Sequence, residues 1–201
     1  MVVISSELVK SLREKTGAGM MDCKRALQES NGNIEQAIDY LRKKGAAVAA
    51  KRADRVANQG VVEAYIHAGG RIGAMVELNC ETDFVAKTPE FKQLAHDIAM
   101  QIAAMNPEYI SKEDVDKETL EKELEIYKSQ AMNEGKPAQV AEKIAQGRLE
   151  KFYQEMCLLE QSFIKDSGKT IKDLLTEATG RVGEKIGIRR FQRYHLGEDH
   201  G

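Results

Sequence analysis

The residue types that bind phosphates occur in this chain, but their spacing does not complete a known phosphate site. The run SGKT at 167–170 has the ending of a phosphate-binding loop, yet that loop needs a glycine five residues before Gly168, where Phe163 stands. Without the glycines the backbone cannot wrap around a phosphate, and Thr170 is better explained as a helix N-cap. The stretch TGAG at 16–19 is too short for a dinucleotide fingerprint and does not follow a strand.

Catalytic and metal sites are equally hard to assemble from the remaining reactive residues. The histidines and cysteines show no metal-ligand spacing with one another; they are His67, His96, His195, His200, Cys23, Cys80 and Cys157. The paired carboxylates of 113–125 fall on a charged helix, where they are usually a solvated face. We therefore expect no catalytic residue, no metal ligand and no cofactor, so the chain is not expected to be an enzyme.

Composition limits the kinds of partner. The 201 residues carry a formal net charge of −2, which gives no general attraction to nucleic acid or to an anionic membrane. Three widely spaced cysteines argue against a disulfide framework and suit a reducing compartment. Without a signal-peptide pattern or an apolar run long enough to span a bilayer, the sequence predicts a cytoplasmic protein.

The stretch NCETDFVAKTPEF at 79–91 contains an aromatic residue at a junction between a strand pattern and a helix pattern. Two interpretations stay open. In one, Asp83 caps a turn and Phe84 folds back over the edge of the sheet. In the other, Phe84 is an anchor that fills a pocket of a partner, with Asp83 supplying a hydrogen bond beside it.

The elements that position these residues begin with a small helical module at 1–45. We expect about three short helices, the first capped by Ser6, and the third capped by Asn33 and ended by Gly45. Helices this short need to pack together, and small modules of this kind usually dock to partners. Of Met20 and Met21, one is expected in the core and the other on the surface.

After this module, the spacing of the apolar residues changes from that of a helix to that of a strand. Residues 46–60 are rich in alanine and basic residues and are expected to form a semi-helical connector. Alternating apolar residues predict strands at 61–67 and 72–80, joined by a glycine-rich hairpin turn. Thr88 and Pro89 predict the start of a helix with one apolar face.

The rest of the chain completes an α+β core expected over 61–201. Residues 111–160 predict two amphipathic helices that pack antiparallel around a break at Gly135 and Pro137. A short helix is expected over 170–182 and a final strand over 186–196. The predicted fold is thus an N-terminal three-helix bundle followed by an antiparallel three-stranded sheet with helices packed on it.

Four stretches in this order resemble a known family. They are LREKTGAGMMDCKRAL at 12–27, VELNCETDFVAKT at 76–88, LLEQSFIKD at 158–166 and RRFQRY at 189–194. Together they are similar to bacterial elongation factor Ts, the guanine-nucleotide exchange factor of elongation factor Tu. Ser162 departs from the proline of many relatives. The chain is also short, with room for one core unit, where longer members have a duplicated core and a coiled-coil insertion.

The resemblance implies a mechanism as well as a fold. The N-terminal bundle would be ubiquitin-associated-like and dock on the GTPase domain of elongation factor Tu through residues given by motif position: Arg13, Met20, Met21 and Lys24. The loop formed by Thr82, Asp83, Phe84 and Val85 would insert near the partner's Mg²⁺, dislodge the ion and loosen GDP. Because short members have one core, a homodimer giving a two-plus-two complex is also implied.

Another class of function stays open as an alternative. Basic residues at 42–55 and 189–193 would suit a ribosome- or RNA-associated binding protein without exchange activity. Such a protein should bind RNA with a steep salt dependence, and the slightly acidic balance of the chain counts against it. An enzyme would need a pocket with converging titratable groups, which the sequence does not offer.

Overall fold

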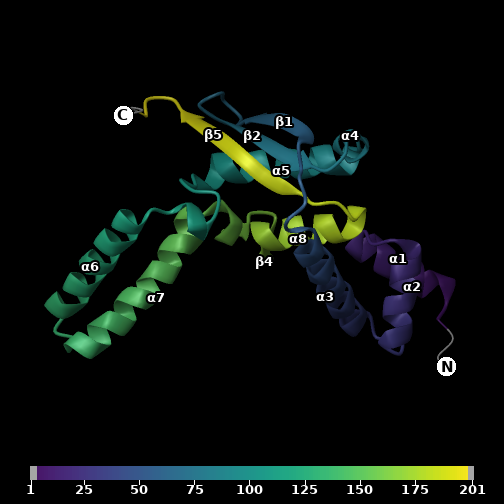
Figure 1. The fold of residues 1–201 in the computed structure, drawn as a ribbon, viewed down its shortest axis with the longest axis horizontal. Coiled ribbons are helices and arrows are strands. Elements are labelled where there is room, and N and C mark those ends of the chain that lie inside the picture. Colours follow the sequence, from purple (N-terminus) through teal and green to yellow (C-terminus); the bar gives the residue numbers. More distant parts are fainter. Residues whose placement is uncertain (1–3, 199–201) are drawn as a thin grey trace. The chain divides into compact units, whose positions relative to one another are not determined.

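The structure is a computed structural model that describes residues 4–198; His200, one of the histidines considered above, lies outside the described residues. Figure 1 shows the elements in chain order. The helices are α1 (Ser6–Thr16), α2 (Met20–Glu29), α3 (Ile34–Arg52), α4 (Asp83–Ala86), α5 (Pro89–Met105), α6 (Lys117–Asn133), α7 (Ala138–Met156) and α8 (Ile171–Val182), with short 3-10 turns η1 (Lys112–Asp114) and η2 (Leu158–Glu160). The strands are β1 (Gln59–Ile66), β2 (Ile72–Cys80), β3 (Ser162–Phe163), β4 (Asp166–Thr170) and β5 (Gly187–His195).

The chain divides into two compact units, each built from separate stretches of sequence. The first contains the described part of Met1–Gly60 together with Asn79–Thr88 and Asp173–Gly187, and the second contains the remaining described residues. The expected domain boundaries at residues 45 and 60 stay predictions. No helix within residues 4–198 is both long and apolar enough to cross a membrane.

Helices α1 to α3 form the expected small bundle in the first unit. Its core is buried and largely aliphatic: Val9, Leu12, Cys23, Ala26, Leu27 and Ala37. The first helix is capped by Ser5, whose side chain accepts from the amide of Leu8, and not by Ser6 as predicted. Asn33 caps α3 as predicted. The prediction that one of the two adjacent methionines is buried is wrong, since Met20 and Met21 are both exposed and Cys23 fills the core instead.

The predicted end of the third helix at Gly45 is also wrong. Helix α3 continues through Gly45 to Arg52, so much of the expected connector is regular helix. Gly45 lies at a close approach of α3 and α8: a Cβ built on Gly180 of α8 would lie 2.7 Å from the Gly45 Cα. The α3 backbone can come this close to Gly180 only because Gly180 has no side chain. Gly45 therefore lies where α3 packs on α8 and does not end the helix.

The three-stranded antiparallel sheet has the order β1-β2-β5, and its strands closely match the predicted ones. Gly69 and Gly70 adopt positive φ in the hairpin turn that joins β1 to β2. Alternate residues of β2 are buried as its pattern predicts, among them Ala74, Val76 and Leu78. In the second unit, α5 follows one face of the sheet, where the carboxylate of Glu63 in β1 accepts a hydrogen bond from the imidazole of His96 at 3.1 Å.

Helices α6 and α7 form the predicted antiparallel hairpin of the second unit (Figure 1). Ion pairs connect them along their length, including Lys128 with Glu142 at 2.7 Å and Arg148 with Glu134 at 3.1 Å. Gly135, with φ of 81°, makes the break between the helices. The SGKT run forms most of strand β4, which pairs with β3, so it lies in a small hairpin and not in a phosphate-binding loop.

Candidate partner-binding site

The stretch Thr82–Val85 forms the start of a four-residue helix that displays an aromatic side chain. Thr82 is the N-cap of α4, with extended backbone angles, and its side chain accepts from the amide of Val85. Phe84 is 81% exposed, whereas Ala86 two residues later is buried. The interpretation in which Phe84 folds back over the sheet edge therefore does not describe this conformation. The helix buries one side and presents Phe84 to the solvent.

Glu184 holds the first residue of this stretch from outside the helix. Its carboxylate accepts from the backbone amide of Thr82 at 3.0 Å and from the hydroxyl of Thr82 at 2.7 Å. From the end of β2, the Cys80 thiol donates to the carbonyl of Thr82 at 3.1 Å. The Thr88 hydroxyl donates to the carbonyl of Val85 at 2.8 Å. Both ends of Thr82–Val85 are thus fixed by hydrogen bonds.

Glu81, which precedes the N-cap Thr82, is held by contacts of its own side chain. Its carboxylate accepts from Arg52 at the end of α3, with both oxygens 3.0 Å from the same guanidinium nitrogen, and from the backbone amide of Lys185 at 2.7 Å. Arg55 lies 3.8 Å away. The Lys185 amide, followed by the Arg52 guanidinium, lowers the pKa of Glu81, so its carboxylate is ionised at neutral pH.

Asp83 is engaged within its own helix. Lys87, one turn later, donates to its carboxylate, and this hydrogen bond lowers the pKa of Asp83 below its usual value. The Asp83 side chain stays about half exposed. It is therefore ionised and accessible beside Phe84.

The four residues expected to dock lie around the turn between α1 and α2. Arg13 is in the last turn of α1, Met20 and Met21 are in the first turn of α2, and Lys24 follows Met20 by one helical turn. All four are exposed, with Met20 at 49% and Met21 at 68%. Two exposed methionines flanked by cations form an adaptable apolar surface with positive charge at its edge.

Helix α8 connects this turn to the Phe84 helix within the first unit. A Cβ built on Gly17, in the α1–α2 turn, would lie 2.9 Å from the guanidinium of Arg181, so Arg181 covers the turn. The same helix meets α3 at Gly180 and leads directly into Glu184. The structure thus places the predicted docking residues and Thr82–Val85 in one compact unit.

Glu81, Glu184 and Arg52 are the residues of this site that the sequence reasoning missed. Glu81 stands inside the NCETDFV stretch, but nothing in the sequence shows that its partners come from α3 and from the segment after α8. Glu184 is 102 residues from Thr82 along the chain. Only the pairing of distant segments in the fold brings these groups together.

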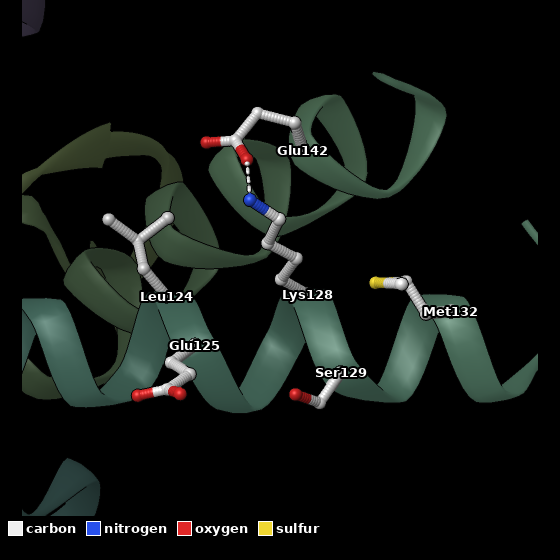
Figure 2. Close-up of a pocket in the computed structure, with 6 residues that line it drawn as sticks. All are labelled: Leu124, Glu125, Lys128, Ser129, Met132 and Glu142. Carbon is white, nitrogen blue, oxygen red and sulfur yellow. Dashed lines mark ion pairs between the residues drawn. The ribbon is translucent and has the colours of Figure 1, made fainter. Parts of the chain in front are cut away.

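The described residues offer no cluster that would suit a metal ion. The three cysteines are free and buried, and burial raises the pKa of Cys157 to about 11, which leaves its thiol protonated and unreactive. Among surface depressions, one of about 400 Å³ lies on the α6–α7 hairpin. Figure 2 shows Lys128 and Glu142 pointing toward each other there, while Glu125 and Ser129 project on the other side of α6. Lys128 and Glu142 neutralise one another, and this depression does not bring together groups suited to catalysis.

The basic residues that suggested an RNA site are largely paired with carboxylates. Lys44 contacts Asp22, and Arg42 lies 3.7 Å from Glu177. At the other predicted position, Arg190 lies 2.8 Å from Glu77. Such pairs reduce the positive charge that these segments could offer to phosphates.

Comparison with known proteins agrees with the resemblance in the sequence. The family profile described as Elongation factor TS matches residues 3–198. The chain is 66% identical to elongation factor Ts of Carboxydothermus hydrogenoformans, over 98% of this chain and 90% of the relative. It is 63% identical to elongation factor Ts of Moorella thermoacetica, over 98% of this chain and 97% of the relative. It is 65% identical to that of Caldanaerobacter subterraneus subsp. tengcongensis, over 98% of each chain. The chain belongs to the elongation factor Ts family.

Proposed function

We propose that this chain releases GDP from elongation factor Tu by inserting the Thr82–Val85 helix beside the partner's Mg²⁺ and dislodging the ion. Membership of its family makes the chain a nucleotide exchange factor for elongation factor Tu in translation. The proposal concerns how it acts. The observation that carries it is Phe84, an aromatic side chain that is 81% exposed on a helix held at both ends.

An exposed aromatic side chain on a fixed helix is suited to insertion into a partner, and Phe84 is here called the wedge. An exposed aromatic residue contributes nothing to the core of its own protein, but it contributes strongly where it enters a partner's pocket. The neighbouring Asp83 brings an ionised carboxylate to the same place. A rigid mount also reduces the entropy lost on insertion.

Simple energetics show that Phe84 cannot act alone. Accelerating release about ten-thousandfold needs roughly 5.5 kcal/mol of differential stabilisation. Burial of one phenylalanine contributes about 1.5–3 kcal/mol. Loss of a divalent cation, often the largest local charge at a phosphate site, would supply much of the remainder. Because coupling is reciprocal, new nucleotide then weakens the binding of the exchange factor.

The remaining binding energy would come from the N-terminal helices. Arg13, Met20, Met21 and Lys24 are exposed around one turn, in the same compact unit as Phe84. We assign them to docking on the GTPase domain of elongation factor Tu in its GDP-bound and nucleotide-free forms. Docking holds the wedge near its target, so that part of the docking energy drives loss of the ion.

We also propose that two copies of the chain associate through the open face of the sheet. This face carries exposed apolar residues of all three strands and the residue after β5: Val62, Ile66, Met75, Tyr194 and Leu196. Ile66 lies over Gly73 of β2, where a Cβ would be 2.6 Å from its side chain, so neighbouring strands form one continuous surface. A two-fold dimer would cover the same apolar face on both copies.

Stimulated GDP release from elongation factor Tu tests the wedge. We expect Phe84→Ala to lower the maximal stimulated rate by about tenfold or more, because the lost burial corresponds to about 1.5–3 kcal/mol. Met21→Ala should instead raise the half-saturating concentration, since it removes docking and leaves the wedge. Val56→Ala is the control, because Val56 is also strongly exposed but belongs to neither group. An unchanged maximal rate for Phe84→Ala would show that the wedge mechanism is wrong.

The same assay separates ion dislodgement from other roles of Phe84. With Mg²⁺ chelated, the ion is already gone and little is left for the wedge to remove. The difference between the wild type and Phe84→Ala should therefore shrink under chelation. An equally large difference with and without Mg²⁺ would mean that Phe84 acts on another part of the partner.

A further inference from the structure

Two carboxylates outside the Thr82–Val85 helix have no role in the proposed function so far. We propose that Glu81 and Glu184, here called the carboxylate clamp, are positioning residues for nucleotide exchange that fix the orientation of Phe84 and connect it to the end of α3. This inference rests on the proposed function and extends it. It concerns residues that touch neither nucleotide nor Mg²⁺ in the mechanism above.

Glu184 fixes the N-cap of the Phe84 helix. One carboxylate accepts both the amide and the hydroxyl of Thr82, at 3.0 and 2.7 Å. A helix of four residues has too few internal hydrogen bonds to be stable by itself, so its geometry depends on such outside contacts. Because Phe84 follows Thr82 by two residues, a shift of the N-cap redirects the aromatic ring.

Glu81 connects the same stretch to the N-terminal helices. Its side chain, 14% exposed, accepts from Arg52, the last residue of α3. It also accepts from the backbone amide of Lys185, next to Glu184. The Lys185 ammonium in turn donates to the carbonyl of Ala53 at 2.6 Å. These contacts join α3, the segment after α8 and the Phe84 helix in a closed set of hydrogen bonds within one unit.

This arrangement explains how docking energy could reach the wedge. If the Phe84 helix moved freely, docking of the N-terminal helices on the partner would bring Phe84 near its target without imposing an orientation. A misplacement of about 1 Å can cost about a hundredfold in rate where geometry decides the outcome. The carboxylate clamp removes that freedom before the partner arrives.

The test measures stimulated GDP release from elongation factor Tu over a range of exchange-factor concentrations. We expect Glu184→Ala to lower the maximal rate by about tenfold or more while leaving the half-saturating concentration unchanged, because the docking residues are intact. Glu184→Gln should restore the rate. Its amide oxygen can accept from the Thr82 amide and its amide group can donate to the Thr82 hydroxyl. Glu35→Ala, which removes an exposed carboxylate in the first turn of α3, is the control.

A double-mutant cycle tests whether Glu184 acts through Phe84. If it does, Phe84→Ala with Glu184→Ala should be no slower than Phe84→Ala alone. Should Glu184→Ala fail to fold by circular dichroism, Glu184→Asp replaces it. The aspartate keeps the charge but is one methylene too short to hold both donors of Thr82, so a lower maximal rate is again expected.

Three results would overturn the clamp: a wild-type rate for folded Glu184→Ala or Glu184→Asp, a change in half-saturating concentration alone, or additive losses in the double mutant. If Phe84→Ala is slow and Glu184→Ala is not, the clamp is wrong and the wedge stands. If Phe84→Ala has the wild-type rate, the proposed function itself fails. The two failures are therefore distinguishable.

Discussion

At the scale of residues, Glu81 is a carboxylate through which acid should weaken the contacts that hold the Phe84 helix. Its pKa lies below its ordinary value of 4.5 because the Lys185 amide and the Arg52 guanidinium stabilise the ionised form. A lowered folded-state pKa contributes stability above the unfolded-state pKa, and this contribution is lost as the pH falls through the folded-state value. Below that range Glu81 is protonated and its ion pair with Arg52 is gone.

We therefore predict that Glu81→Gln is less stable than the wild type at pH 7 and that the two converge at acid pH. Glutamine cannot ionise, so at every pH the variant lacks the stability that ionised Glu81 contributes and that the wild type loses in acid. Urea unfolding followed by circular dichroism at a series of pH values measures the difference. A constant difference between the two proteins from pH 7 to pH 3 would show that the charge of Glu81 is not what stabilises the contact.

At the scale of elements, α3 and α8 approach each other closely at Gly45 and Gly180 within the first unit. The crossing is asymmetric. A Cβ on Gly180 would lie 2.7 Å from the Gly45 Cα, whereas a Cβ on Gly45 would find its nearest neighbour, the Thr176 carbonyl, at an ordinary 3.7 Å. The two glycines therefore have different tolerance for a side chain.

We predict that Gly180→Ala destabilises the protein by about 1–3 kcal/mol, because the backbones would have to separate. Gly45→Ala should be tolerated or stabilising by up to about 1 kcal/mol, since alanine favours the helix. The matched control is Gly147→Ala in α7, where a Cβ meets nothing within 4 Å and a similar small gain is expected. Chemical unfolding checks the ranking, and equal effects of the two crossing glycines would contradict the asymmetric contact.

At the scale of the whole molecule, the open face of the sheet is the feature that a single copy leaves uncovered. Exposed apolar surface shared by neighbouring strands is costly in water and marks interaction sites. The same face carries a Glu77–Arg190 ion pair, which gives it a polar edge. A second copy placed by a two-fold axis would bury the apolar part on both sides.

We predict that light scattering gives the wild type twice the chain mass of 22.4 kDa and gives Met75→Lys the mass of one chain. A lysine on this face would place an unpaired charge in the buried interface. Val56→Lys introduces the same charge at an exposed apolar residue that is not part of any strand and should stay dimeric. A wild type that is monomeric at high concentration, or a Met75→Lys dimer, would contradict this interface.

Local patterns predicted much of this fold because each depends on a short stretch. The alternation of Ile72–Cys80 predicted β2, and the Thr88-Pro89 pair predicted the start of α5. Gly45 shows the limit of such reasoning. A glycine after an apolar stripe is typical of a helix end, but α3 continues through Gly45, which packs against a backbone 135 positions later in the chain, at Gly180. Met20 and Met21 likewise could not be assigned to core or surface from their types alone.

By itself, the sequence determined the strands of the three-stranded sheet, most of the helices, the family, and Phe84 as a candidate contact residue. Periodicity, caps and motif residues act over a few positions, so they can be read without the fold. Only the tertiary structure decided that Phe84 is exposed and that Glu184 and Glu81 hold its helix. Those contacts join segments about a hundred residues apart, as Thr82 and Glu184 do, and long-range pairing of this kind leaves no local pattern in the chain.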